Sequence, residues 1–208
     1  MTAAFATLAL AAATVGSLHS LAPDHWVPFT ALARAQGWGR GRTASITLLC
    51  GFGHVTVSVA LGLAGLFLGS AVLQALGQKL EAVAGILLVG FGLAYGAWGL
   101  RRAIRQRLPS HDPGQERTTA WTLFLLFSVD PCVAVVPILF AAAPLGVLPA
   151  AAVVVTYEAA TLATMLVLVL FAHAGAAALR VRWIDRYGDG AAGGLIAATG
   201  LVLMAFGI

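Results

Sequence analysis

The chain alternates between long apolar stretches and short polar connections. The apolar stretches cover residues 3–33, 44–72, 80–101, 119–142, 147–178 and 190–208. A transmembrane helix needs roughly 20 mainly apolar residues, so the pattern predicts an all-α, polytopic membrane protein with six transmembrane helices. The first stretch contains Pro23 and Pro28, and the fourth contains Pro131 and Pro137. Because proline cannot donate a backbone hydrogen bond, we expect both of these helices to be broken.

The composition agrees with this class of protein. Of the 208 residues, 60% are hydrophobic and 10% are charged, whereas a soluble domain carries roughly a quarter charged residues. No Lys or Arg precedes the first apolar stretch, so it lacks the charged region of a signal peptide and is predicted to be a membrane helix. Cys50 and Cys132 both lie in apolar stretches and predict no disulfide framework. Cys132 could be a ligand of a soft metal, but we interpret it as a small core residue.

The basic residues predict the orientation of the chain in the membrane. Eleven of the twelve Lys and Arg residues lie in the first, third and fifth connections, and only Lys79 lies in another. The positive-inside rule places those three connections in the cytoplasm. We therefore expect an inner-membrane, multi-pass protein with both termini outside. The arginine clusters flank span ends, which argues against a nucleic-acid partner.

The two halves of the sequence match at a constant offset of 108 residues. The segment "LHSLAP" at 18–23 corresponds to "LFSVDP" at 126–131, and Gly85, Gly92 and Gly99 correspond to Gly193, Gly200 and Gly207. Glu81 likewise corresponds to Asp189. A unit of three spans reverses direction in its second copy, and inverted repeats with broken helices are common in secondary transporters. We predict repeats 1–108 and 109–208 within one membrane domain.

Ionisable side chains interrupt the apolar stretches near mid-depth. Such groups cost roughly 2.5–3.5 kcal/mol each on insertion scales and usually serve a function. We predict a metal site formed by His19, Asp24, His25, His54 and Asp130. Supporting positions are Ser20, Pro23, Thr56, Ser128, Pro131 and Glu158. The prolines should also leave the carbonyl groups of His19 and Phe127 without their helical donors.

The residue types indicate which ion this site would take. Neutral imidazole suits nickel, cobalt, zinc and copper(II), whereas calcium and magnesium prefer sites made only of oxygen. In a straight helix His19 and His25 would point to different faces, about 240° apart, so shared coordination requires an irregular helix. We expect Ni²⁺ or Co²⁺ as a transported substrate, with no resident cofactor.

At these residues the sequence resembles the nickel/cobalt transporter superfamily, especially its short, urease-accessory-type members. The motif H-x-x-x-x-D-H of that family is complete as His19, Asp24 and His25, and "GFGHVTV" with His54 matches its second element. The segment "VVPILFAAAPLG" resembles a third element, whereas "SVDP" matches the downstream polar motif only loosely. The chain also lacks the family's extra N-terminal helix. The resemblance implies a secondary transporter of a divalent transition metal, operating in the uptake direction.

Other functions fit parts of the pattern. An intramembrane metal-dependent hydrolase would need a general base, for which Glu158 is the candidate. An exporter of a small anion or solute could share the architecture, and the polar groups could serve only to hydrogen-bond helices together. We expect no enzymatic activity. The sequence does not distinguish nickel, cobalt and zinc, and it leaves the direction, the energy coupling and the oligomeric state open.

Overall fold

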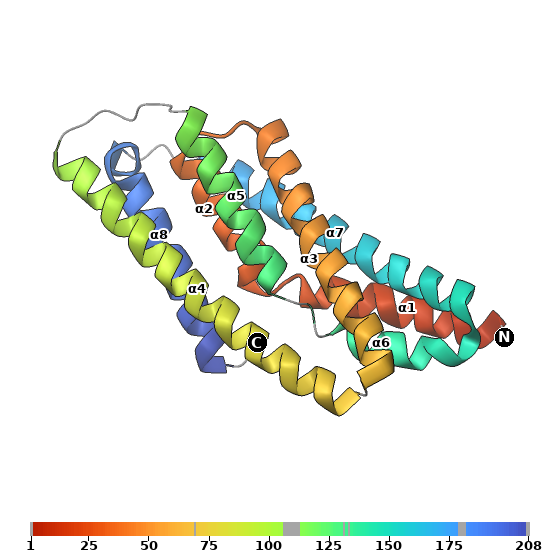
Figure 1. The fold of residues 1–208 in the computed structure, drawn as a ribbon. Helices are drawn as coiled ribbons and strands as arrows, with labels where there is room; N and C mark the ends of the chain where they lie inside the picture. The colour runs from red at the N-terminus through yellow and green to blue at the C-terminus, as the bar shows by residue number, and fades with distance from the viewer. Residues whose placement is uncertain are drawn as a thin grey trace.

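The structure, a computed structural model, is helical throughout residues 2–68, 70–105, 113–130, 132, 134–178 and 182–206, apart from short connections. These are the residues that the structure describes. The helices follow one another in the order shown in Figure 1: α1 (Thr2–His19), the 3-10 turn η1 (Pro23–His25), α2 (Val27–Ala35), α3 (Arg40–Leu68), α4 (Ser70–Ile104), α5 (Pro113–Val129), α6 (Val135–Ala142), the 3-10 turn η2 (Ala143–Leu145), α7 (Val147–Ala178) and α8 (Arg182–Phe206).

The predicted break in the first apolar stretch is confirmed. Helices α1 and α2 meet at a bend of 79°. Ala22 is extended, with φ −56° and ψ 136°, because a residue before proline is driven out of the helical region. Pro28 lies in the first turn of α2, where its missing N–H costs nothing. As expected, the His19 carbonyl has no donor four residues on, and it accepts the N–H of Ala22 at 3.0 Å instead.

The fourth apolar stretch is also divided. Helix α5 ends at Val129 and α6 begins at Val135, so the predicted span 119–142 consists of two shorter helices. Asp130 forms a bend at the end of α5. Pro131, which the sequence makes responsible for this break, lies outside the described residues.

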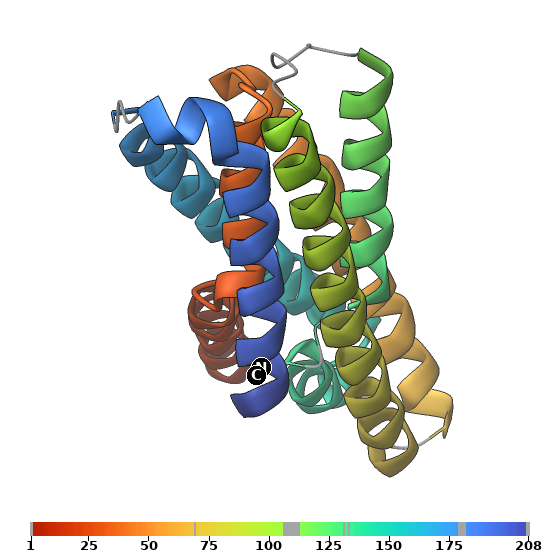
Figure 2. The ribbon, with the colours of Figure 1, turned by 90° about the vertical axis from the view of Figure 1, so that its left-hand side faces the viewer.

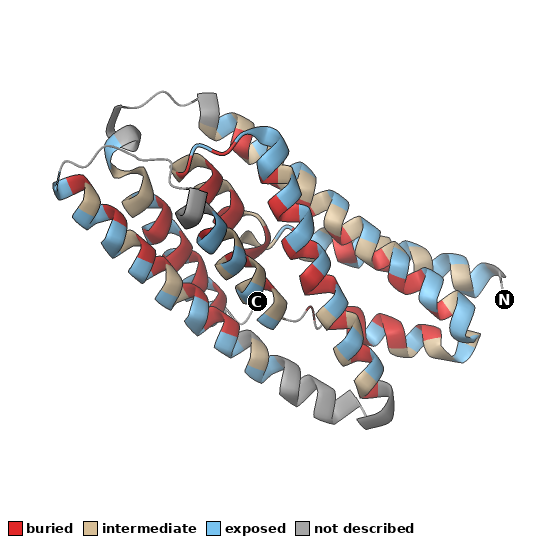
Figure 3. Cartoon of the chain, turned by 45° about the horizontal axis from the view of Figure 1, so that its top comes forward, coloured by how far each residue is buried: buried red, intermediate tan, exposed pale blue. Residues whose placement is uncertain are grey.

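The long helices have the length and composition of membrane spans. Within the described residues, four helices are long and apolar enough to cross a membrane. A fifth span is added if the bent pair of α1 and α2 counts as one. The sequence predicts six, and the difference is the divided 119–142 segment. Large apolar side chains such as Val167 and Phe171 are exposed, and Figure 3 shows that the buried positions face inward. An apolar outer surface of this kind suits lipid.

Helices α4 and α8 form a close antiparallel pair, which lies along one edge of the molecule in Figure 1 and faces the viewer in Figure 2. Small residues let the two backbones approach, as in many membrane helix pairs. Gly92 packs against Gly193, and Gly85 packs against Gly200. These four glycines are the matching glycines of the two sequence halves. At the 108-residue offset the first contact is equivalent to the second, as expected for two helices related by a twofold axis.

A second pair of contacts follows the same offset. Helix α1 packs on α7, where Gly16 lies against Thr161, and α5 packs on α3, where Phe124 lies against Gly53. Adding 108 to Gly16 gives Phe124, and adding 108 to Gly53 gives Thr161. The helix boundaries agree as well, since α2 at 27–35 corresponds to α6 at 135–142.

The arginine-rich ends of the helices lie together. The end of α4 and the starts of α3, α5 and α8 meet at the top of Figures 1 and 2. A polar network joins them, in which Gln36 donates to Thr119 at 2.9 Å and Tyr95 donates to Asp189 at 2.7 Å. Arg102 pairs with the other oxygen of Asp189 at 3.4 Å. The network ties both halves of the chain together at this end.

Candidate metal centre

A cavity of about 370 Å³ lies beside the break between α1 and α2. All five residues that the sequence predicts as a metal site line it: His19, Asp24, His25, His54 and Asp130. Apolar side chains of α4 and α8, such as Leu88 and Leu203, form another part of its wall. The structure therefore brings together side chains from the first two apolar stretches and from the end of α5.

The break at Pro23 brings the two motif histidines together. The ring centroids of His19 and His25 lie 4.5 Å apart, in an edge-to-face arrangement. A straight helix would separate them, so the irregular helix is what allows both to reach the cavity. Between them in sequence, Asp24 places Oδ2 3.0 Å from Nδ1 of His25. Asp24 and His25 are 8% and 1% exposed, so this carboxylate and imidazole meet away from solvent.

His54 reaches the same place from α3. The neighbouring Gly53 leaves room for α5 to pack closely, and this brings the Phe127 carbonyl 3.2 Å from Nδ1 of His54. A carbonyl oxygen can only accept, so Nδ1 carries the proton and a neutral ring keeps its lone pair on Nε2. The ring centroid of His54 lies 5.2 Å from that of His25.

The imidazole groups of the cavity have unused bonding capacity. Nε2 of His19, His25 and His54 and Oδ1 of Asp24 are buried and have no hydrogen-bond partner among the described residues. A buried polar atom without a partner costs roughly 1–3 kcal/mol. One metal ion could satisfy several such lone pairs at once, so the arrangement fits an ion better than a finished hydrogen-bond network.

The Phe127 carbonyl explains one sequence prediction. A proline at 131 cannot donate to the carbonyl four residues earlier, and His54 donates to it instead. Such a bond to the second ring nitrogen fixes the tautomer and the direction of a metal-binding histidine. The second half of the chain thus orients a histidine of the first half.

The supporting residues lie around the cavity or away from it. Ser20 is fully buried and donates to the Gly16 carbonyl at 2.7 Å, and Ser128 donates to the Phe124 carbonyl at 2.8 Å. Thr56 is exposed and donates to its own helix. Pro23 forms the break. Glu158 lies half-buried on α7 and is not among the residues that line the cavity.

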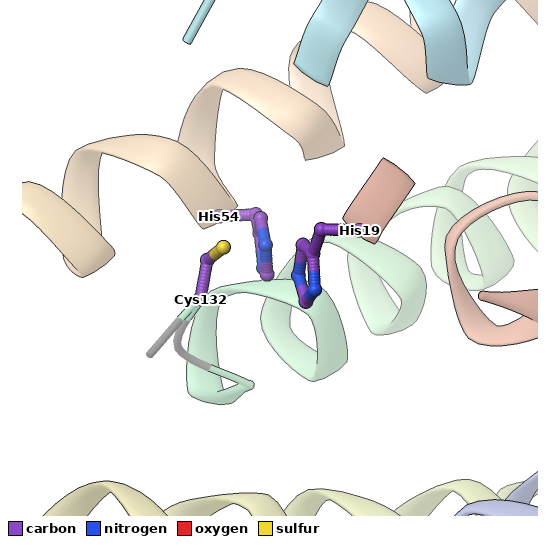
Figure 4. Close-up of side chains that lie close together, drawn as sticks. All are labelled: His19, His54 and Cys132. Carbon is purple, nitrogen blue, oxygen red and sulfur yellow. The ribbon is translucent and has the colours of Figure 1, made fainter. Parts of the chain in front are cut away.

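Cys132 is a candidate ligand that the sequence analysis considered but ranked below a role in the core. Its Sγ and ligand nitrogens of His19 and His54 all lie within 4.8 Å of one another, and together they could hold a metal ion. Figure 4 shows the three side chains grouped together. The interpretation of Cys132 as a core residue followed from its apolar surroundings. One signal did point to it, because Cys132 occupies the position of Asp24 in the second half of the sequence.

Comparison with known proteins adds no relative. No protein-family model, no curated protein and no solved structure matches the chain. The functional interpretation therefore rests on the cavity and on the helices that form it.

Proposed function

We propose that the chain is a secondary transporter that moves a divalent transition-metal ion, Ni²⁺ or Co²⁺, through the cavity beside the broken helix. His19, Asp24, His25 and His54 replace part of the ion's water shell, and Asp130 supplies charge from the second half. The ion enters on the side of the termini and leaves at the arginine-rich end. This is the function implied by the resemblance to the nickel/cobalt transporter superfamily.

The observation that carries the proposal is the convergence of three imidazoles on one cavity, two of them buried and that of His19 half-buried. Their Nε2 atoms have no partner among the described residues, and imidazole nitrogen is a preferred ligand of nickel, cobalt and zinc. The charged side chains of the described cavity lining are the two aspartates, Asp24 and Asp130. Negative charge at the site favours a cation over an anion, which weighs against an anion exporter.

The arrangement of the helices supports alternating access between two inverted repeats, 1–108 and 109–208. The α4–α8 glycine contacts and the α1–α7 and α3–α5 contacts each agree with the 108-residue offset. In secondary transporters, sites of this kind lie where broken helices of two inverted repeats meet. Rocking of one repeat against the other would open the cavity first to one side and then to the other.

The membrane potential can drive such transport. A potential of 100 mV, negative inside, contributes roughly 2.3 kcal/mol for each elementary charge, and so about 4.6 kcal/mol for a dication. The positive-inside rule orients the arginine-rich end toward the cytoplasm. Uptake would then run down the electrical gradient without a nucleotide.

A metal-dependent hydrolase is the weaker alternative. It needs a base next to the metal-bound water, and the candidate base Glu158 is not among the described residues of the cavity.

Transport into proteoliposomes tests the proposal. The purified protein would be reconstituted with a metal-sensitive dye inside the vesicles, and a potassium gradient would set a potential that is negative inside. We expect Ni²⁺ or Co²⁺ influx that increases with the potential and is lost in His25→Ala. The matched control is His173→Ala, since His173 is a buried histidine of α7 that does not line the cavity.

Two results would contradict the proposal. One is an influx that is equal in the wild type, in His25→Ala and in protein-free vesicles. The other is an influx that His173→Ala abolishes as completely as His25→Ala, because the cavity would then have no special role.

A further inference from the structure

We propose that Cys132 is a metal ligand, and that together with His19 and His54 it makes the cavity selective for thiophilic ions, Co²⁺ and Zn²⁺ ahead of Mn²⁺ and Mg²⁺. This inference rests on the proposed function and narrows its substrate class. It also gives the second half of the chain a direct bond to the ion.

The distances permit a shared ion. The three ligand atoms lie within 4.8 Å of one another. Ligands at about 2.0–2.3 Å from one tetrahedral Zn²⁺ lie roughly 3.5 Å apart, so the atoms need to move by little more than about 1 Å. The Cys132 thiol lies next to a second candidate ligand, His54. His54 is 2% exposed, its Nε2 has no partner among the described residues, and Figure 4 shows its ring beside the sulfur.

Ser58 fixes Cys132 relative to His54. The Ser58 hydroxyl donates to the carbonyl of His54 at 2.7 Å, one turn earlier on α3. The same oxygen accepts the backbone N–H of Cys132 at 2.7 Å. A buried serine thus links the backbones of both ligands across the two halves of the chain. Ser58 acts as a positioning residue, because it holds ligands without facing the ion itself.

Tyr157 supports the charged form of the sulfur. Its hydroxyl is hydrogen-bonded to Sγ of Cys132, and its side chain is buried. When an ion binds, the S–H bond breaks, the sulfur lone pair forms the bond to the metal, and the proton leaves to water in the cavity. No electron is gained or lost. The tyrosine O–H then donates to the thiolate, and hydrogen bonds to charged groups are the stronger ones.

The donor set determines the class of ion. Two imidazole nitrogens and one thiolate suit zinc and cobalt, whereas magnesium and manganese prefer oxygen. Three protein ligands also leave a fourth position open, as in zinc sites that exchange a ligand. An ion held in this way can leave, and transport requires that. Asp24 and His25 lie next to this group and offer the ion a second set of ligands along the cavity.

Cobalt spectroscopy on the purified, full-length protein tests the inference. Co²⁺ bound to a thiolate gives an intense charge-transfer band in the near ultraviolet, which oxygen and nitrogen ligands do not give. We expect this band in the wild type, its displacement by Zn²⁺, and no displacement by excess Mg²⁺. Cys132→Ser should abolish the band and weaken Co²⁺ binding at least about tenfold. Cys50→Ser is the matched control, since Cys50 is an equally buried cysteine that does not belong to the group of His19, His54 and Cys132.

The possible outcomes separate the two proposals. Calorimetric Co²⁺ binding to the wild type without the band would overturn the inference about Cys132 and leave the proposed function standing. A band that persists in Cys132→Ser would also overturn it. Absence of any Co²⁺ or Ni²⁺ binding would overturn both. If Cys132→Ser fails to fold, Cys50→Ser decides the point, because a band that persists in it comes from Cys132, the one cysteine that remains.

Ser58→Ala separates positioning from ligation. We expect the charge-transfer band to remain while Co²⁺ affinity falls by about 10–100-fold, the usual effect of losing an outer-shell partner of a metal ligand. Ser58→Thr, which keeps the hydroxyl, should recover most of the affinity. If Ser58→Ala binds Co²⁺ as tightly as the wild type, Ser58 does not position the ligands.

Discussion

The two broken segments of the chain share a framework but differ in chemistry. In the first, His19 and His25 flank a proline, and at the 108-residue offset their counterparts are Phe127 and Val133. The framework residues are alike, since Ser20 and Ser128 each donate to the carbonyl four residues earlier. The second break contributes Phe127 and the Asp130 carboxylate to the cavity wall and places the Cys132 thiol beside His19 and His54. The first contributes two imidazoles and the Asp24 carboxylate.

This difference separates what folds the protein from what binds the ion. Residues that control close helix approach, such as Gly16 and Gly53, serve contacts that recur in both halves. The imidazoles that line the cavity all come from the first half. A site built from two unlike copies can hold one ion between them, and motion of one copy relative to the other changes its surroundings. The following predictions test this division, from the largest effect to the smallest.

Replacing His54 by the residue type at the equivalent position of the second half should have the largest effect on metal binding. At the 108-residue offset His54 corresponds to Leu162. We expect His54→Leu to lose Co²⁺ and Ni²⁺ binding by roughly 100-fold or more, since it removes a ligand and also the group that uses the Phe127 carbonyl. Calorimetry on the purified variant measures the loss.

Leu162→Ala is the matched control for this prediction. Leu162 lies on α7 against Gly51 and does not line the cavity. Its truncation should leave the metal affinity within about threefold of the wild type, while the loss of packing lowers stability. Equal loss of binding in both variants would mean that the two halves do not differ in function.

Acid should weaken metal binding by protonating the histidines of the first half. Metal and proton compete for the same imidazole lone pair. Binding is therefore strongest where the imidazoles are neutral and falls as acid protonates them. We expect a fall of about tenfold per pH unit for each competing histidine, and a shallower slope in His25→Asn. A Co²⁺ affinity that does not fall at any acid pH at which the protein stays folded would contradict the imidazole site.

The glycine contacts of α4 and α8 should matter equally in both halves. A Cβ on Gly193 would lie 2.2 Å from the backbone nitrogen of Gly96, and one on Gly92 would lie 2.4 Å from that of Ala197. Gly92→Ala and Gly193→Ala should each destabilise the protein by roughly 1–3 kcal/mol, as expected for overpacking. Thermal unfolding in detergent measures the effect.

Neighbouring glycines provide the controls for that comparison. Gly90 and Gly194 lie on the same two helices, and a Cβ on either would contact nothing within 4 Å. Their replacement by alanine should be neutral or slightly stabilising, because alanine favours a helix by up to about 1 kcal/mol over glycine. If only one of Gly92→Ala and Gly193→Ala is destabilising, the α4–α8 pair is not twofold in its energetics.

The polar network at the arginine-rich end should give the smallest effect. Tyr95→Phe removes the hydrogen bond to Asp189 and leaves the ring in place. We expect a loss of about 1–2 kcal/mol in stability with Co²⁺ affinity unchanged, since Tyr95 does not line the cavity. Phe91→Leu, which changes a ring stacked on Tyr95, controls for packing. A drop in metal affinity in Tyr95→Phe would show that this end is coupled to the site.

Much of the site could be predicted from the sequence because the cost of burial restricts polar groups to functional places. The histidines, Asp24 and Asp130 stand out within apolar stretches, and the structure collects them around one cavity. The breaks at Pro23 and after Asp130 follow from proline's missing donor. Contacts between distant segments could not be predicted from the sequence. The partners of the Cys132 thiol on α1, α3 and α7 were therefore not predicted.

Other features of the structure were not predicted because they depend on local geometry. The His19 carbonyl accepts a bond from Ala22 because the chain turns directly after α1, a geometry that the proline alone does not specify. Glu158 has the residue type of a site carboxylate, but the structure leaves it out of the cavity lining. The number of helices that cross the membrane also differs from the prediction, because the segment 119–142 is divided into α5 and α6.

The most direct test of the central claim is metal binding to the purified protein, measured by calorimetry for Ni²⁺, Co²⁺, Zn²⁺ and Mg²⁺, with His19→Ala beside the wild type. The account predicts that the wild type binds at least one of Ni²⁺, Co²⁺ and Zn²⁺ far more tightly than Mg²⁺, and that His19→Ala loses this binding. A wild type that binds none of the three, or a His19→Ala variant that binds them unchanged, would contradict it.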